Sequence, residues 1–565
     1  MNSYKKPSDD LCTQFLSMDG RDEKSYCHIT GSYDYGDFIL TVEHVPENPG
    51  LRPARLRVMM PLAHAKFPRD VFTPRSREIA ARSFIARRFA ERSEYNTIKM
   101  PGIRGGSIFL ERPGRELLET SAVVIGDTYL EVRFTVLFPV QRRKVHAQSA
   151  VELFQKKVPA TIRESLVFDN IDGEKLADWI ETNEDADALR TMLADRGLVA
   201  FIADGSILNT GASTVSDRPV RFTSPDELAV TVELPNRGSV RGMGIPRGIT
   251  LVTGGYSQGK TTLLRAVELG VYNHRFGDGR ELAVTVPDAV GIRVDEGRRV
   301  VDVDLSPLIK SRKGTVDYQR FSSESAGPVE SFAANLMEAL EIGTSLLLFD
   351  DETTVSSFID RDARIQKLLP HEEEPLIRII DLLPVLRDRH GVSSVVVGGS
   401  GDFFDIADTV LTLKKFRVHA VTAEARRIAE NQPSGRIPEV PETFVLPSQR
   451  RPLSFSLEPI KDETGSRTIM RGAGYVQYGD EFIDLTRVTQ LVSISQGRAI
   501  ARGISMVHRL MDGSTSLNDA VKKVIKRVET IGLDALSNRY MGDLASFRAY
   551  ELAAAINRMA RLKIK

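Results

Sequence analysis

The sequence predicts an α/β fold with a central parallel sheet, flanked by an N-terminal α+β part and a small, mainly helical C-terminal part. A glycine-rich loop at residues 254–262 lies between an apolar β-like run and an amphipathic helical pattern. Apolar runs at residues 345–349, 393–397 and 410–413 are separated by helical patterns, which is typical of parallel strands with crossover helices. A chain of 565 residues is also too long for one core, so several domains are expected.

The N-terminal part alternates short β-like runs with polar breaks, as at residues 38–42 and 130–136. One arginine-rich helical pattern interrupts them, beginning near Pro74. We therefore expect an α+β domain over residues 1–160.

The C-terminal part follows a polar, proline-bearing connection at residues 431–452. Its apolar positions recur at helical spacing over residues 520–533 and 544–562. The expected organisation is a domain at 1–160, a phosphate-loop domain at 165–440 and a small domain at 455–565.

Composition excludes several classes of protein. Hydrophobic residues make up 41% and charged residues 27%, which is ordinary for a soluble globular chain. Lysine plus arginine and aspartate plus glutamate both number 76, so a global basic field is not the means of attracting nucleic acid. With two cysteines, no secretion signal and no long apolar run, we expect a cytoplasmic protein with no membrane segment.

The glycine-rich loop has the pattern Gly-x4-Gly-Lys-Thr, in which glycine lets consecutive N–H groups face one phosphate chain. Lys260 is expected to neutralise the β- and γ-phosphates, and Thr261 to bind Mg²⁺. The helix that begins there directs its positive end at the anion. Contacts with ATP are thus predicted for Gly254, Gly255, Tyr256, Ser257, Gln258, Gly259, Lys260, Thr261 and Thr262.

Three adjacent acids, Asp350, Asp351 and Glu352, end the apolar run at residues 345–349. In phosphate-loop ATPases the acid at such a strand end holds Mg²⁺ and the next prepares the attacking water. This predicts Asp350 as a metal residue and Asp351 as the catalytic base, with Glu352 as the alternative base and Lys260 as the catalytic cation.

These motifs and the segments around them resemble the predicted ATPases of the ABC class, a mostly bacterial family that includes a trypanosomal mitochondrial RNA-editing factor. The similarity extends nearly end to end. It is carried by residues 31–35, 131–136, 204–208, 217–219, 270–274, 277–281, 304–307, 321–324, 333–340 and 399–410.

The resemblance implies an N-terminal domain fused to an ABC-type ATPase domain and a small C-terminal domain. It also implies ATP bound with Mg²⁺, an ATP-dependent homodimer in which a signature loop of one copy reaches the nucleotide of the other, and, for the trypanosomal member, RNA binding. Because family N-terminal domains sit close to the nucleotide, Arg104 is a further candidate contact with ATP.

The chain departs from the family pattern where catalysis is concerned. Asp351 is shorter than the glutamate expected in its place, Pro328 in the signature region 325–330 has no N–H to donate, and residues 399–402 stand where most ABC proteins have a histidine. Misplacement of about 1 Å can slow a reaction by ~10²-fold. We therefore expect hydrolysis to be slow or lost.

Weaker patterns leave alternatives open. Residues 290–296 are either a nucleotide-sensing loop or a charged hairpin, and residues 354–362 are expected at an ABC dimer interface. RNA binding is considered for the arginine helix with Arg77, Arg82, Arg87 and Arg88 and for residues 103–107 and 141–144, although a charge run is more often a solvated face.

The sequence thus predicts an ATPase that couples nucleotide state to domain or dimer rearrangement. Two other hypotheses are a non-hydrolysing RNA or protein scaffold and a phosphotransferase.

Overall fold

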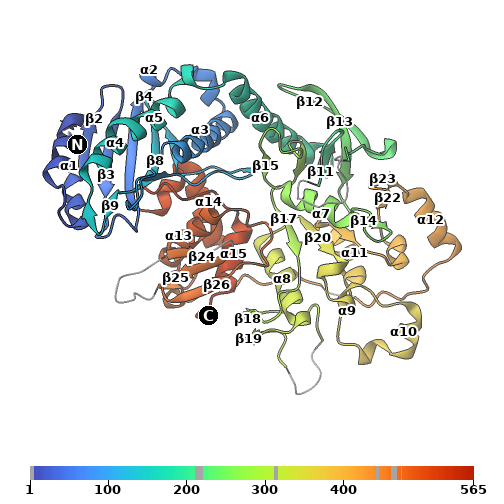
Figure 1. Ribbon diagram of the computed structural model, residues 1–565. Coiled ribbons are helices and arrows are strands. Elements are labelled where there is room, and N and C mark those ends of the chain that lie inside the picture. The colour runs from blue at the N-terminus through green and yellow to red at the C-terminus, as the bar shows by residue number, and fades with distance from the viewer. Residues whose placement is uncertain (1–4, 210–219, 311–315, 441–443, 460–467, 472–473) are drawn as a thin grey trace. The chain divides into compact units, whose positions relative to one another are not determined.

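The computed structural model describes residues 5–209, 220–310, 316–440, 444–459, 468–471 and 474–565 (Figure 1). The family-like segment 217–219 lies outside the described residues. The chain divides into two compact units: unit 1 is Met1–Glu184 with Ile531–Ser546, and unit 2 is Asp185–Thr530 with Phe547–Lys565.

Unit 1 contains a largely antiparallel sheet in the order β1-β2-β3-β4-β8-β5, with β7 also paired to β8. Every second residue of β4 is buried, because alternate side chains of a strand point to opposite faces. The N-terminal α+β prediction is confirmed. The strands of this sheet are β1 Lys5–Pro7, β2 Gly31–Asp34, β3 Ile39–His44, β4 Ala54–Pro61, β5 Ser107–Phe109, β7 Val123–Ile125 and β8 Tyr129–Leu137. Outside it lie β6 Glu116–Leu117 and a hairpin of β9 Val140–Gln141 and β10 Lys144–Val145.

Helices and an aromatic cluster complete unit 1. Phe15, Tyr26, Phe138 and Phe154 are fully buried and contact one another through their rings. The helices are α1 Ser8–Ser17, α2 Leu62–Ala65, α3 Arg75–Tyr95, α4 Ala147–Glu152 and α5 Val158–Leu166, and α6 Gly173–Asp195 continues into unit 2.

Unit 2 is built on a six-stranded sheet in the order β17-β20-β21-β14-β22-β23, parallel except for β23, as the sequence predicts. β20 and β21 are buried along their whole length, which explains their continuous apolar runs. The strands are β14 Ile249–Gly254, β17 Ala289–Ile292, β20 Leu346–Asp350, β21 Ser393–Val397, β22 Thr409–Lys414 and β23 Arg417–Ala420.

Helices cover this sheet. Phe332 of α8 packs against Phe349 of β20 in one hydrophobic cluster that also contains α11. The helices are α7 Lys260–Leu269, α8 Pro328–Ile342, α9 Ser356–Ile359, α10 Ala363–Leu368, α11 Ile379–His390 and α12 Thr422–Asn431. A second sheet has the order β12-β13-β11-β16, with β11 Leu198–Ala203, β12 Ala229–Leu234, β13 Gly238–Pro246 and β16 Ala283–Thr285, and β18 Val300–Val303 pairs with β19 Phe321–Ser323.

The C-terminal part contains three helices and a three-stranded sheet, and the prediction of a mainly helical part is confirmed. The elements are β24 Thr468–Arg471, β25 Tyr475–Tyr478, β26 Glu481–Asp484, α13 Ile494–Leu510, α14 Leu517–Ile531 and α15 Ala549–Asn557. Among the described residues, no helix is both long and apolar enough to cross a membrane.

Candidate functional site

The glycine-rich loop turns between the end of β14 and the start of α7. Gly254 has a φ of +138° and Gly259 a φ of +98°, which L side chains rarely adopt. A Cβ on Gly254 would lie 2.7 Å from the carbonyl oxygen of Leu413 in β22. Conformation and packing therefore both require glycine at the first position of the motif.

Lys260 is the first residue of α7, and its ammonium folds back over the loop. Its Nζ donates hydrogen bonds to the carbonyl oxygens of Gly254, at 3.0 Å, and Gly255, at 3.1 Å. An ammonium has three N–H donors, so these two bonds fix the charge over the loop and leave donor capacity for an anion. Thr261 and Thr262 follow in the first turn of the helix, and the Thr261 side chain is exposed.

The remaining loop residues differ in how they are held. The Gln258 side chain accepts a hydrogen bond of 2.6 Å from the backbone N–H of Lys415. Ser257 has a φ of +58°, and Tyr256 is 91% exposed. The loop is thus fixed to its neighbour at Gln258 and presents an aromatic ring to solvent.

Asp350 ends β20 at the edge of the sheet where β14 gives way to the loop, because carboxyl ends of parallel strands share an edge. Leu347 and Phe349 belong to the hydrophobic cluster with α8, so strand alternation directs Asp350 to the opposite face. Its carboxylate is buried, and within the described structure Oδ2 has no hydrogen-bond partner. A buried carboxylate oxygen without a partner is costly unless a cation or donor binds it.

Asp351 and Glu352 begin the short turn that follows β20. Burial raises the pKa of Asp351, and the negative charge of Asp350 raises it further, whereas the Lys260 ammonium lowers it. The Glu352 side chain is exposed. The fold therefore places Asp351 within electrostatic range of both Asp350 and Lys260.

A cation site made entirely of protein groups needs several acidic, histidine or cysteine side chains close together. Within the described part of the chain, no group of three or more histidine, cysteine, aspartate and glutamate side chains could hold a metal. Mg²⁺ beside phosphates is usually bound through one or two protein ligands.

Residues 293–296 link the acidic strand end to α8. The N–H of Val294 donates to the carbonyl oxygen of Thr353 at 3.0 Å, directly after the three acids. The N–H of Asp295 donates to Ser331 Oγ in α8 at 3.3 Å. Of the segment 290–296, residues 290–292 belong to β17, and these contacts hold residues 293–296 against the acidic turn and α8.

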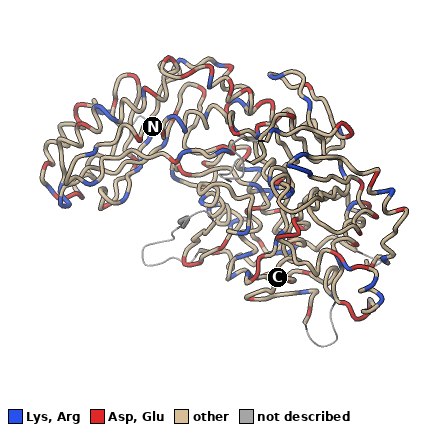
Figure 2. Tube along the Cα trace, turned by 45° about the vertical axis from the view of Figure 1, so that its right-hand side comes forward, with Lys and Arg blue, Asp and Glu red and all other residues tan. Residues whose placement is uncertain are grey.

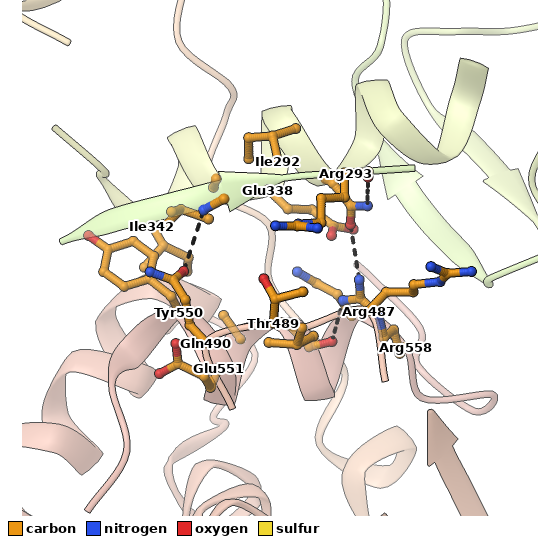
Figure 3. A pocket seen from close by; sticks show the side chains of 18 residues that line it. Ile292, Arg293, Glu338, Ile342, Arg487, Thr489, Gln490, Tyr550, Glu551 and Arg558 are labelled. Atoms are coloured by element: carbon orange, nitrogen blue, oxygen red, sulfur yellow. Dashed lines mark hydrogen bonds between the residues drawn. The ribbon is translucent and has the colours of Figure 1, made fainter. Parts of the chain in front are cut away.

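C-terminal residues also contact this loop and its neighbours, and Figure 3 shows Thr489, Arg487 and Arg558 facing the segment that contains Ile292 and Arg293. Arg558 donates to Asp295 Oδ2 from both Nε, at 3.0 Å, and a terminal nitrogen, at 2.8 Å. Thr489 donates to buried Glu268 of α7, which Arg293 also contacts at 3.1 Å. The cavity between the C-terminal residues on one side and β17 and α8 on the other is about 70 Å³, far below the ~300 Å³ of a small ligand pocket. This region therefore joins structural elements and is too small to hold a ligand.

The signature region does not present a row of N–H groups. The N–H of Ser325 donates to Ser323 Oγ at 3.2 Å, and that of Ala326 donates to the Arg298 carbonyl at 2.9 Å. Pro328 is the first residue of α8. Two of the N–H groups are therefore used within the chain, and the proline supplies none.

Residues 354–362 include side chains that stabilise the fold and side chains that are exposed at the surface. Arg361 is buried and donates to Glu439 at 2.9 Å, and Asp362 caps α10. Ser356 and Ser357 are exposed. The Arg361–Asp362 pair therefore stabilises this unit, whereas the two serines lie at its surface.

The arginines of α3 serve unit 1 itself, and charges of both signs are interspersed along each unit (Figure 2). Arg82 is buried and donates to two carbonyl oxygens and two glutamates. The other three are also paired, so the helix is not the basic surface that its sequence suggests. Their partners are Glu184 for Arg77, the Pro113 carbonyl and Glu91 for Arg87, and the carbonyls of Glu164 and Asn170 for Arg88.

Arg104 lies in unit 1, whereas the phosphate loop belongs to unit 2. It lines a cavity of about 470 Å³ together with Arg142, Arg143 and the buried Glu23. Arg142 and Arg143 form the tip of the β9–β10 hairpin with positive φ, +50° and +65°. The two arginine segments that are far apart in the sequence, 103–107 and 141–144, thus meet at one place.

Sequence reasoning missed the tip of the β22–β23 hairpin, Lys415 and Phe416, which contacts the phosphate loop. Two residues between two β-like runs indicate a hairpin. Its nearness to the loop depends on β22 being the neighbour of β14.

Three family models match consecutive parts of the chain. The model for the N-terminal region of ATPases of the ABC class matches residues 8–169, the ABC ATPase P-loop domain matches 172–450, and the MRB1590 C-terminal domain matches 467–565.

Similarity to individual proteins is more limited. An uncharacterised protein of Methanocaldococcus jannaschii is 38% identical over 108 residues, which cover 17% of this chain and 24% of that protein. The chain thus spans about a quarter of that relative's length. The match to the solved structure of cbiO1 from Clostridium perfringens, part of the ABC transporter complex cbiONQ, covers 42% of this chain and 96% of that chain at 13% identity, with a TM-score of 0.25.

Proposed function

Because the chain belongs to the ABC-class ATPases, we propose that it binds ATP with Mg²⁺, hydrolyses it slowly and couples nucleotide state to a rearrangement of domains or of a dimer. Asp350 carries this proposal. Its buried Oδ2 has no partner among the described residues and lies at the same sheet edge as the phosphate loop. A magnesium ion held by Thr261 and Asp350 would supply the missing positive charge.

Each residue of the site has a proposed role. Lys260 binds the β- and γ-phosphates, and the N–H groups of the loop 254–259 surround the phosphate chain. Magnesium, when bound, neutralises phosphate oxygens. Asp351 orients the attacking water and accepts its proton, and Glu352 is the alternative for this step. The raised pKa of Asp351 makes it a stronger base than an exposed aspartate.

Slow turnover follows from the same site. Asp351 reaches one methylene less far than glutamate, and a base displaced by about 1 Å can lose ~10²-fold in rate. The signature region has few N–H groups to offer the nucleotide bound by a second copy. Pro328 has none, and those of Ser325 and Ala326 already donate within the chain.

The functional organisation follows the domain bounds 1–160, 165–440 and 455–565. We expect two copies to pair head to tail with ATP between them, each using its signature region and the exposed Ser356 and Ser357. We also propose a cytoplasmic location, in keeping with the two free cysteines, Cys12 and Cys27.

The test is phosphate release from ATP, with ATP affinity measured on the same samples. Wild-type protein should turn over ATP, Lys260→Ala should lose binding and turnover, and Asp351→Asn should bind ATP without turning it over. Binding without turnover in the wild type would instead favour a non-hydrolysing scaffold. Phosphate transferred to an acceptor would favour a phosphotransferase.

RNA binding is a second candidate function, favoured by the arginine cavity of unit 1. Arg104 and Arg142 are exposed and share that cavity. Single-stranded RNA affinity should fall with rising salt, and Arg104→Ala with Arg142→Ala should reduce that dependence. Arg163→Ala, which removes a surface pair with Asp37, is the matched control. A flat salt response would exclude a backbone-binding site here.

A further inference from the structure

The β22–β23 hairpin ends in a strained two-residue tip, Lys415 and Phe416, in unit 2 (Figure 1). Both have positive φ, +52° and +62°. Two-residue hairpins of this kind favour asparagine, aspartate or glycine, because other L residues are strained at positive φ. Turn geometry therefore does not explain the lysine and the phenylalanine at these two positions, and their side chains should serve contacts outside the turn.

The tip is fixed against the phosphate loop. β22 runs parallel to β14, with Leu413 beside Gly254. The N–H of Lys415 donates to the Gln258 side chain at 2.6 Å. Phe416 lies against the next glycine of the motif, since a Cβ on Gly259 would be 3.4 Å from Phe416 Cδ1. The aromatic ring is thus held at the start of α7, where the phosphates are proposed to bind.

The ring is not there to fill a core. Phe416 is 48% exposed, so about half of its surface faces solvent beside the loop. A rigid aromatic surface next to an anion site suits a ligand with phosphates at one end and a flat π-system at the other. Stacking on an aromatic side chain tolerates any base, because every base has a π-face.

We propose that Phe416 stacks on the nucleobase of the triphosphate bound by the loop. This rests on the proposed nucleotide binding and assigns the base to a hairpin after the last parallel strand. It predicts that base-bearing nucleotides bind more tightly than bare polyphosphate. Purines should bind more tightly than pyrimidines, because their π-face is larger.

The experiment compares ATP with inorganic tripolyphosphate, each with Mg²⁺, in the full chain. Phe416→Ala should weaken ATP about tenfold, equivalent to ~1.4 kcal/mol, and change tripolyphosphate less than twofold. Phe416→Trp should retain ATP affinity, and the fluorescence of the new tryptophan should change with ATP but not with tripolyphosphate. The wild-type protein, with Trp179 as its one tryptophan, gives the background signal. Phe482→Ala, at a 54% exposed ring of β26, is the control and should change neither.

Other outcomes separate the alternatives. Phe416→Gly removes the ring while suiting the positive φ, so it keeps the test informative if the alanine variant does not fold. Equal loss of both ligands would mean that Phe416 only shapes the loop, and no loss would exclude contact. A base-dependent loss in Tyr256→Ala alone would assign stacking to the other exposed ring. Failure of the wild type to bind either ligand would refute nucleotide binding itself.

Discussion

Replacing Arg558 by alanine should slow ATP turnover more than it weakens ATP binding. Arg558 lies just after α15 and makes two hydrogen bonds to Asp295 and one of 3.1 Å to Asn335. The Arg558 and Asp295 side chains are 7% and 15% exposed. Removing one partner of a buried ion pair costs about 3–5 kcal/mol. Because Asp295 keeps some contact with water, we expect the lower end of that range, about 3 kcal/mol.

The effect on turnover follows from what Asp295 holds. The loop 293–296 donates from Val294 to the Thr353 carbonyl, beside the three acids, and from Asp295 to Ser331. A loop that loses Arg558 can shift this turn, and a shift of about 1 Å can slow catalysis by ~10²-fold. The phosphate loop itself takes no part in the Val294–Thr353, Asp295–Ser331 or Arg558–Asp295 contacts. ATP affinity should therefore change less than threefold, which is about 0.6 kcal/mol.

A double-mutant cycle measures the pair. Unfolding free energies and turnover rates would be determined for Arg558→Ala, Asp295→Ala and the double variant. Hydrogen bonds to charged groups contribute about 1.5–3 kcal/mol, which is the coupling energy expected. Arg558→Lys keeps the charge but loses the two-point geometry, and should recover about half of the stability. A coupling below about 0.5 kcal/mol, or an unchanged turnover rate in Arg558→Ala, would refute the reasoning.

Three further predictions concern single residues. Gly254→Ala should abolish triphosphate binding and lower the free energy of unfolding by about 1–3 kcal/mol. Gly255→Ala should lower it little, because a Cβ there would meet nothing closer than 3.6 Å. Equal melting temperatures for the two variants would contradict this difference. Asp350→Asn should raise the melting temperature without ligand, because it removes the charge of a buried carboxylate whose Oδ2 has no hydrogen-bond partner among the described residues, and it should remove the Mg²⁺ dependence of ATP binding. A lower melting temperature would argue against an uncompensated carboxylate. Arg82→Met should destabilise unit 1 by about 3 kcal/mol in chemical unfolding while leaving RNA affinity unchanged; a loss of RNA affinity in folded protein would restore α3 as a binding surface.

The phosphate loop and the acidic strand end could be predicted because their chemistry depends on short-range order. Gly254 and Gly259 are required by backbone conformation, and Asp350 follows an apolar strand that must be buried on both faces. Both signals are contained in fewer than ten consecutive residues. The parallel sheet followed from the same kind of local pattern.

The roles of the arginines could not be predicted, because their partners are distant in sequence. Arg77 pairs with Glu184, 107 positions away, and Arg88 donates to a carbonyl 76 positions away. A cluster of arginines on one helix looks the same in sequence whether it faces solvent or carbonyl groups. Arg104 and Arg142 are the converse case, since two short basic segments separated in the sequence line one cavity in the folded unit.

The site is arranged so that ligand binding should stabilise unit 2. It holds a buried carboxylate oxygen with no partner among the described residues, an ammonium over loop carbonyls and a strained hairpin tip. A ligand that satisfies these groups adds about 2.7 kcal/mol at 100 times its Kd. Because the acidic turn is hydrogen bonded to the loop 293–296, and that loop to Arg558, part of this stabilisation should reach the C-terminal helix α15. Slower hydrogen exchange in α15 when ATP and Mg²⁺ are added, but not in Arg558→Ala, is the outcome this connection requires.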